Sequence, residues 1–169
     1  LGYLGVHVAQ MLKAVGLNVQ GWSRTEKNLD GIQSFSGELG LDQMLANTNF
    51  LACILPNTQA TKGILNLRVF NKMPQGSYIL NAGRGSQLVE PDLLEALDNG
   101  QIRGAALDVF ETEPLPINHP FWTDERILFT PHHAAEVFLP AVVKTFLDNI
   151  YRSRNNQPLI GLVDEDLGY

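Results

Sequence analysis

Short apolar runs alternate along the chain with segments in which apolar residues recur every three or four positions. The first pattern is typical of buried strands and the second of amphipathic helices. Strands are predicted over 17–22, 32–35, 50–55, 104–110 and 127–130, and a further strand begins at Tyr78. Helices are predicted from Gly5 to Gly16, over 41–46, from Pro91 to Gly100 and from Pro140 to Asn155. This alternation predicts an α/β fold with a doubly wound parallel sheet of the Rossmann type.

The predicted strand over 50–55 has six apolar residues in a row and no alternation. A strand with one face in water alternates apolar and polar residues, whereas a strand inside a parallel sheet reads as a continuous apolar run. We therefore expect this strand to be covered on both faces. The tripeptide Pro56-Asn57-Thr58 ends it.

The chain opens on Leu1-Gly2-Tyr3-Leu4-Gly5, which looks like the last four residues of the turn G-x-G-x-x-G after one leading residue. In that turn a pyrophosphate rests on a helix N-terminus, where free amides and the helix dipole favour anions. The first glycine and the strand before it are absent from the sequence. The sheet is therefore predicted to be truncated at its first strand, and the sequence to be a fragment.

The predicted strand over 17–22 ends in Ser23-Arg24-Thr25. In a dinucleotide-binding unit the residue about 20 positions past the glycines contacts the ribose, and an acidic residue there binds a free 2′-hydroxyl. Arg24 stands at about that distance from Gly2, and no carboxylate occurs before Glu26. An arginine offers a fork of donors to a phosphate, so the segment favours NADPH, with NADH as the second choice. The alternative is a solvated loop arginine.

Three charged or titratable residues, Arg84, Glu113 and His132, each follow a predicted strand. Because parallel strands place their carboxyl ends at one edge, we expect these residues to converge there beside a nicotinamide. An arginine can bind a substrate carboxylate with two parallel bonds. A histidine can act as a general acid near neutral pH, and a carboxylate bonded to its other nitrogen would fix the tautomer. Taken singly, each residue has an ordinary structural alternative.

Composition limits the class of partner. The 169 residues suffice for one domain, and the net charge of −6 argues against a nucleic-acid or anionic membrane surface. The single cysteine, Cys53, lies in an apolar run and is expected to be a buried structural thiol. No disulfide is possible within the chain, which favours a reducing, cytoplasmic location. The sequence shows no membrane span and no signal peptide.

Three spaced motifs resemble the D-isomer-specific 2-hydroxyacid dehydrogenases, and within that family the bacterial glyoxylate/hydroxypyruvate reductases. They are Asn81-Ala82-Gly83-Arg84-Gly85, the segment from Leu107 to Leu115, and Thr130-Pro131-His132. The resemblance covers nearly the whole chain in order. It implies NADPH-dependent reduction of small 2-oxo acids, glyoxylate or hydroxypyruvate. It also implies a homodimer, a dinucleotide-binding domain over 1–152, and a tail over 153–169 that returns towards an absent substrate domain.

The same resemblance assigns roles to individual residues. Arg84 would bind the substrate carboxylate and carbonyl, His132 would be the acid/base, and Glu113 its partner. Trp122 falls in a bulky loop that would shape the substrate pocket, with a plain core role as the alternative. No metal site is implied. The cofactor-contacting positions would be Gly2, Tyr3, Leu4, Gly5, Ser23, Arg24, Thr25, Leu55, Pro56, Ala82, Gly83, Arg84, Asp108 and His132.

The other histidines need separate treatment. Position 133 is a histidine where the family usually carries an aliphatic residue, and His133 is expected to point away or to tune substrate choice. His7 and His119 have no partner nearby in sequence and are expected to be structural or solvated.

Two other functions compete with the reductase. One is an NADH-linked dehydrogenase of the phosphoglycerate or D-lactate type, against which the Ser23-Arg24-Thr25 segment argues. The other is a nucleotide-sensing protein, similar to the transcriptional corepressors that share this family's motifs. The sequence carries no additional tail or binding motif for that role.

Overall fold

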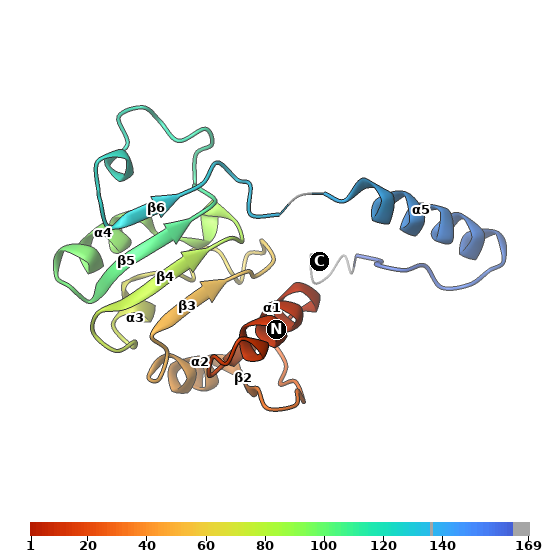
Figure 1. Ribbon diagram of the computed structural model, residues 1–169, viewed down its shortest axis with the longest axis horizontal. Coiled ribbons are helices and arrows are strands. Elements are labelled where there is room, and N and C mark those ends of the chain that lie inside the picture. Colours follow the sequence, from red (N-terminus) through yellow and green to blue (C-terminus); the bar gives the residue numbers. More distant parts are fainter. Residues whose placement is uncertain (136, 164–169) are drawn as a thin grey trace. The chain divides into compact units, whose positions relative to one another are not determined.

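A computed structural model describes residues 1–135 and 137–163, shown in Figure 1. The chain divides into two compact units, residues 1–131 and 132–169. The predicted domain boundary at residue 152 stays a prediction. In chain order the elements are α1 (Tyr3–Ala14), β1 (Gln20–Ser23), β2 (Gln33–Ser36), α2 (Gly37–Leu45), β3 (Phe50–Cys53), α3 (Leu67–Phe70), β4 (Ser77–Asn81), the 3-10 turn η1 (Gly85–Gln87), α4 (Glu90–Asp98), β5 (Ile102–Leu107), the 3-10 turn η2 (Pro120–Trp122), β6 (Ile127–Phe129) and α5 (Leu139–Arg154).

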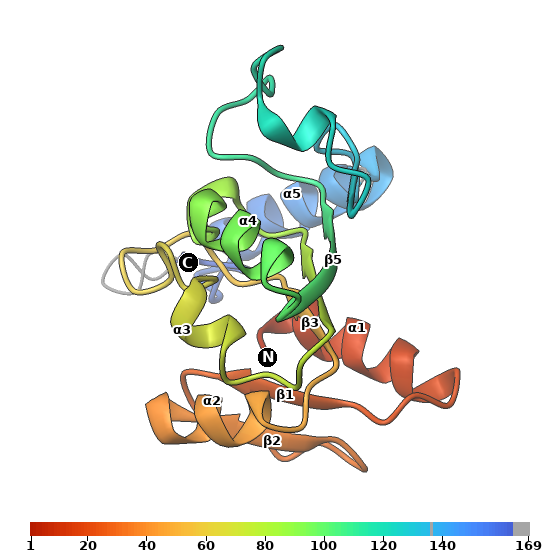
Figure 2. The ribbon, with the colours of Figure 1, turned by 90° about the vertical axis from the view of Figure 1, so that its left-hand side faces the viewer.

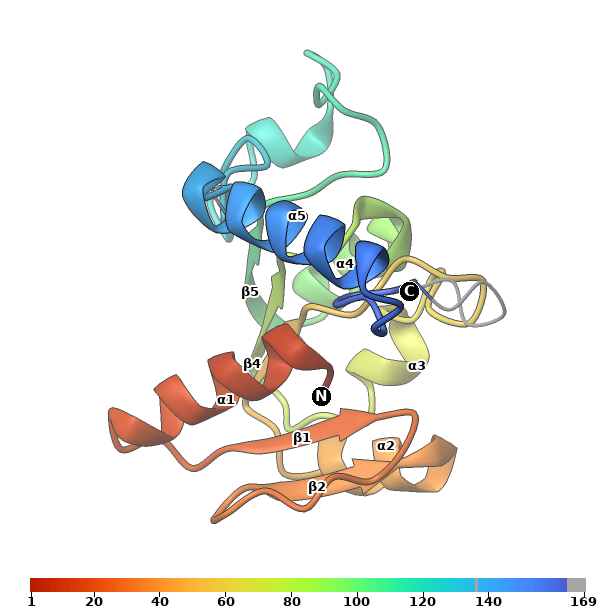
Figure 3. The ribbon, with the colours of Figure 1, turned by 90° about the vertical axis from the view of Figure 1, so that its right-hand side faces the viewer.

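The strands of the first unit are all parallel. They form a two-stranded sheet, β1–β2, and a four-stranded sheet in the order β3–β4–β5–β6. Each pair of neighbours in the larger sheet is consecutive in the chain, so every connection crosses over the sheet. Figures 2 and 3 show α1 on one side of this sheet and α3 with α4 on the other. The predicted Rossmann-type α/β fold is confirmed.

Local signals set the ends of several helices. Gly16 and Gly100 adopt left-handed backbone conformations, with φ of +89° and +74°, just past the ends of α1 and α4. Glycine enters that region without steric cost, so each helix can end at this position. The two predicted helix ends are confirmed. Asn66 caps α3, because its side-chain oxygen accepts a hydrogen bond from Val69 N at 3.2 Å.

The core lies between the four-stranded sheet and the helices α2, α3 and α4. Its largest fully buried apolar side chains come from these helices, from the strands and from η2. They include Leu45, Phe70, Ile79, Leu93, Ile102, Leu107 and Phe121.

The expectation that the strand over 50–55 is covered on both faces is wrong. The strand ends at Cys53, and its residues alternate in burial, with Phe50 and Ala52 exposed and Cys53 buried. The Phe50 ring stacks on the Tyr78 ring of β4, with centroids 4.9 Å apart and planes 6° apart. On the face of the sheet that carries Phe50, the apolar ring therefore packs against an aromatic ring of the neighbouring strand.

The second unit contains α5, which spans 16 residues. The predicted apolar stripe lies on this helix, and none of the helix residues is buried. Within the described residues, no helix combines the length and hydropathy needed to cross a membrane. The end of the predicted tail over 153–169, residues 164–169, lies outside the described residues.

Candidate functional site

The ladder of the four-stranded sheet continues one residue past three of its strands. After β4, β5 and β6, the first residue beyond the strand donates its amide to the last carbonyl of the neighbouring strand. These bonds join Ala82 N to Cys53 O at 3.1 Å, Asp108 N to Asn81 O at 2.9 Å, and Thr130 N to Leu107 O at 3.0 Å. The segments that follow these three strands are therefore fixed side by side. Together with the loop that follows β3, we call them the carboxyl edge of the sheet.

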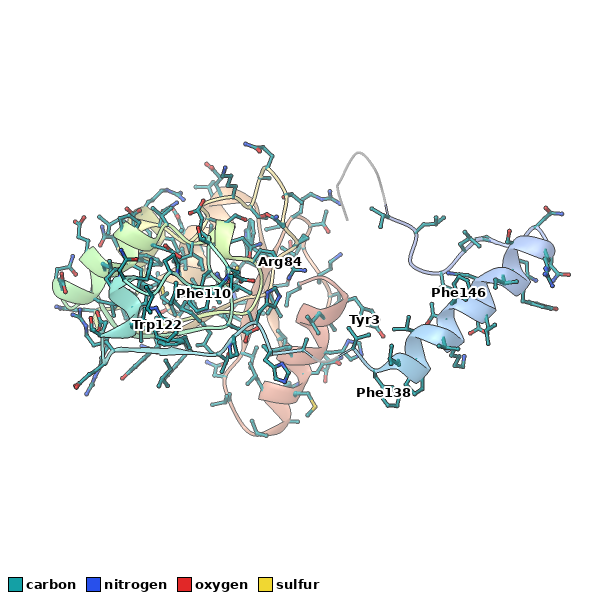
Figure 4. All side chains as sticks on the ribbon, turned by 90° about the horizontal axis from the view of Figure 1, so that it is seen from above. Tyr3, Arg84, Phe110, Trp122, Phe138 and Phe146 are labelled. Carbon is teal, nitrogen blue, oxygen red and sulfur yellow. The ribbon has the colours of Figure 1, made fainter. Side chains whose placement is uncertain are left out.

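The loop that carries Arg84 is shaped by Asn81, whose side chain is only 1 % exposed. Its amide nitrogen donates to Arg84 O, and its amide oxygen accepts from Gly83 N, both at 3.1 Å. The Arg84 guanidinium is exposed and donates to Gly83 O at 2.7 Å. The backbone of Arg84 is thus rigidly placed, while its charged fork lies at the surface of the carboxyl edge (Figure 4).

The two glycines beside Arg84 serve close approach within the chain. Neither Gly83 nor Gly85 is among the residues with positive φ. A Cβ on Gly85 would collide with the backbone of Phe110 and Glu111, and one on Gly83 with the Gln87 side chain. A left-handed turn is therefore not what requires glycine at these two positions. The neighbouring loop after β5 occupies the space that a side chain would need.

The segment after β5 holds both predicted acids. Asp108 is 7 % exposed, and its carboxylate accepts a hydrogen bond from the Thr130 hydroxyl at 2.5 Å. The Glu113 carboxylate accepts from Phe110 N at 3.0 Å. Glu113 is thus anchored back to the end of β5 by this bond, although the residue is exposed.

His119 has a partner far away in sequence, Glu90 at the start of α4. His119 Nε2 lies 3.2 Å from Glu90 Oε2, and the other Glu90 oxygen accepts from Glu111 N at 3.3 Å. Because Phe121 N donates to His119 Nδ1 at 3.3 Å, the neutral ring carries its proton on Nε2 and donates it to Glu90. Glu90 therefore holds both ends of the loop that contains Glu113.

The N-terminus of α1 is open to an anion. Gly2 is the N-cap, the first turn has no acidic residue, and a Cβ on Gly2 would meet nothing within 4 Å. Tyr3 and Leu4 are 87 % and 56 % exposed, while Gly5 is buried. The free amides of this turn and the positive end of the helix dipole fit a pyrophosphate group.

The predicted ribose-contacting segment begins at Ser23, the last residue of β1. Ser23 is buried, and its hydroxyl donates to Thr25 O at 2.9 Å, which folds the segment into a tight turn. Arg24 and Thr25 are exposed. The turn therefore presents the Arg24 side chain at the surface beside the end of β1.

Trp122 is tied to its own loop. Its indole nitrogen donates to Pro116 O at 2.8 Å, and its ring meets the Phe129 ring edge-on with centroids 4.9 Å apart. In Figure 4, Phe110 lies between Trp122 and Arg84. The indole is 49 % exposed, so a substrate-contacting role for Trp122 stays a prediction.

His132 is the first residue of the second unit. It adopts a left-handed backbone conformation, with φ of 54°, which is uncommon for a residue other than glycine. Its approach to Arg84 and Glu113, and the different orientation expected for His133, stay predictions. In residues 1–135 and 137–163, no cluster of histidine, cysteine and acidic side chains could hold a metal ion.

Sequence reasoning missed two residues of this edge, Gln87 and Glu90. The Gln87 side chain is 0 % exposed and bonds to the loops after β3 and β4. A buried glutamine in a short turn leaves no periodic signal in the sequence. The contacts of Glu90 are with residues 21 and 29 positions away, so local spacing could not reveal them either.

The parallel sheet, the crossover helices and the open helix N-terminus define a Rossmann-type α/β domain. A family model for the NAD-binding domain of D-isomer specific 2-hydroxyacid dehydrogenases matches residues 1–134. The chain therefore belongs to the D-isomer specific 2-hydroxyacid dehydrogenase family, as the three sequence motifs predicted.

Individual relatives agree with this assignment. A protein of Serratia proteamaculans named glyoxylate/hydroxypyruvate reductase A is 46 % identical, over 99 % of this chain and 54 % of its own length. The chain thus spans about half the length of the curated relatives it matches. An NADPH-dependent glyoxylate/hydroxypyruvate reductase from Sinorhizobium meliloti, solved with NADP and sulfate, is 39 % identical with a TM-score of 0.95, over 100 % of this chain and 55 % of that one.

A third relative is a D-isomer specific 2-hydroxyacid dehydrogenase from Xanthobacter autotrophicus, solved in complex with NADPH and MES. It is 37 % identical, with a TM-score of 0.96, and the match covers 99 % of this chain and 69 % of that one.

The close approach at Gly85 generates a stability prediction. In Gly85→Ala the added methyl group meets the backbone of Phe110 and Glu111, which cannot rotate away, so the loops must separate. Overpacking of this kind costs about 1–3 kcal/mol. Denaturant unfolding of the full-length protein should show a loss of that size. An equally stable Gly85→Ala variant would contradict the geometry.

Proposed function

We propose that the protein carrying this chain is an NADPH-dependent reductase of small 2-oxo acids, with glyoxylate and hydroxypyruvate as substrates. The observation that supports this most is the arrangement at the carboxyl edge, where the loop of Arg84 and the loop of Glu113 are fixed beside each other. Ligands of open α/β sheets bind at this edge. Relatives that share the whole chain are named for the same activity. The proposal includes a homodimer in the cytoplasm.

The proposed cofactor site runs from the N-terminus of α1 to the turn after β1. The amides at Gly2–Gly5 would hold the pyrophosphate, and Arg24 would pair with a 2′-phosphate. Ser23, Thr25, Leu55, Pro56, Ala82, Gly83 and Asp108 would complete the site. Two relatives were solved with NADPH or NADP, which supports this choice over NADH. When bound, the reduced nicotinamide supplies a hydride.

The proposed chemistry divides between three side chains. Arg84 would bind the substrate carboxylate through its guanidinium fork and orient the neighbouring carbonyl. His132 would donate a proton to the carbonyl oxygen as the carbonyl carbon accepts the hydride, so the product is a 2-hydroxy acid. Glu113 would bond the other histidine nitrogen and favour the protonated ring. His132 follows Thr130 by two residues, so the chain itself keeps the histidine backbone near the end of β6.

The direct test is an assay of the full-length protein. Reduction of glyoxylate, hydroxypyruvate and pyruvate is followed with NADPH and with NADH through the loss of absorbance of the reduced cofactor. We expect glyoxylate or hydroxypyruvate with NADPH to give the highest kcat/KM. No reduction of any of the three acids would overturn the proposal, and a higher kcat/KM with NADH would favour the NADH-linked alternative.

The Arg24 assignment predicts a change in cofactor preference. Arg24→Asp removes the donors to a 2′-phosphate and supplies an acceptor for a ribose hydroxyl. A hydrogen bond to a charged group contributes about 1.5–3 kcal/mol, which corresponds to roughly 10- to 100-fold in binding. The ratio of kcat/KM with NADPH to kcat/KM with NADH should therefore fall by at least about 10-fold. Lys27→Asp, which changes the same charge at an exposed residue of the same loop, serves as the control. An unchanged ratio in Arg24→Asp would remove Arg24 from the site.

The two adjacent histidines can be separated by substitution. His132→Ala should lower kcat by about 10²- to 10⁴-fold, the usual contribution of a general acid, while NADPH still binds. His133→Ala should keep most of the activity. Steady-state kinetics and fluorescence titration with NADPH measure the two quantities. The reverse pattern would show that His133 is the acid/base.

A further inference from the structure

Gln87 is a polar side chain with no exposed surface, at the end of the turn η1. A buried carboxamide that left its oxygen or nitrogen unpaired would cost about 1–3 kcal/mol. Every polar atom of this side chain is paired. The partners lie in two different loops of the carboxyl edge, so the contacts decide how those loops are placed relative to each other.

The Gln87 oxygen receives hydrogen bonds from the β4 side and from β3. Arg84 N donates to Oε1 at 2.9 Å, and the buried Cys53 thiol donates to the same atom at 3.5 Å. Burial raises the pKa of the Cys53 thiol, so the group stays protonated and keeps its donor. The predicted burial of Cys53 is confirmed.

The Gln87 nitrogen donates in the opposite direction, to the loop after β3. Its two hydrogens reach Leu55 O at 2.9 Å and Pro56 O at 3.0 Å. Two donors face the oxygen and two acceptors face the nitrogen, so the orientation of the carboxamide is fixed by its surroundings. One side chain thus bridges the turn at Leu55–Pro56 and the backbone of Arg84.

We propose that Gln87 is a positioning residue that couples the cofactor-binding loop at Leu55–Pro56 to the substrate-binding Arg84. Because its side chain has no exposed surface, it would act through the backbone of both loops and not by contact with a ligand. The inference rests on the proposed function, because the roles of Arg84, Leu55 and Pro56 belong to that proposal. If it holds, the one buried carboxamide of Gln87 sets the affinity both for NADPH and for the 2-oxo acid.

The test uses Gln87→Met in the full-length protein. Methionine has a similar length and fills the space, but it cannot bond Arg84 N or the carbonyls of Leu55 and Pro56. We expect the NADPH dissociation constant and the KM for glyoxylate each to rise at least 10-fold, while kcat falls less than 3-fold. Fluorescence titration and steady-state kinetics measure these values, and thermal unfolding records the change in stability.

Gln101→Met is the matched control. The Gln101 nitrogen also donates to two backbone carbonyls, Phe70 O and Met73 O, both at 2.9 Å, but at the amino end of β5. This variant should lose stability in the same way while keeping the affinity for NADPH and the KM for glyoxylate within twofold of the wild type. A structural role for Gln87 alone would make the two variants behave alike.

A second variant, Gln87→Glu, keeps the shape and the acceptor but places an oxygen against Leu55 O and Pro56 O. It should show the same two losses. The inference is overturned if either Gln87 variant folds and binds both ligands like the wild type. It is also overturned if neither Gln87 variant folds while Gln101→Met does, because Gln87 would then be required for folding. An inactive wild type would overturn the proposed function, whereas an active wild type with unaffected Gln87 variants contradicts this inference alone.

Discussion

The structure depends on one constraint, the parallel alignment of four strands whose ladder continues one residue beyond the sheet. The amides of Ala82, Asp108 and Thr130 each bond to the neighbouring strand, so the loops that follow start from fixed positions. Ordinary loops are mobile, and a site built on them would lose precision. Here the backbone of each loop is an extension of the sheet. The polar groups of three distant segments are thereby placed along one edge.

Buried or half-buried polar side chains then hold these loops in place. Asn81 shapes the turn before Arg84, Gln87 bridges to the loop after β3, and Glu90 fastens the loop after β5 at both ends. Each of them is satisfied by backbone groups or by another side chain, which makes such a network rigid instead of costly. Gly85 permits the last step, the close packing of the Arg84 loop against Phe110 and Glu111. The position of the exposed charged groups therefore depends on the buried amide side chains, and the position of those side chains depends on the sheet.

Much of the fold followed from the sequence, because it rests on local signals. The helical spacing of apolar residues and Gly16 predicted α1, and Pro91 and Gly100 predicted the two ends of α4. The apolar runs predicted every described strand to within a few residues. The placement of Arg84 and Glu113 at strand ends came from the same patterns. The burial of Phe50 was mispredicted, since an apolar run reveals hydrophobicity but not whether another element covers it. The contacts of Gln87 and the Glu90–His119 pair were not predicted, because the partners lie far apart in the chain.

The central claim is that the carboxyl edge binds a dinucleotide, and amide hydrogen exchange of the full-length protein with and without NADPH tests it most directly. The account predicts slower exchange in residues 2–6, at Leu55 and Asn57, and in residues 82–84 when NADPH is present. It predicts no change in residues 99–104, which lie at the opposite end of β5. Protection confined to residues 99–104, or no protection at the carboxyl edge at saturating NADPH, would contradict it.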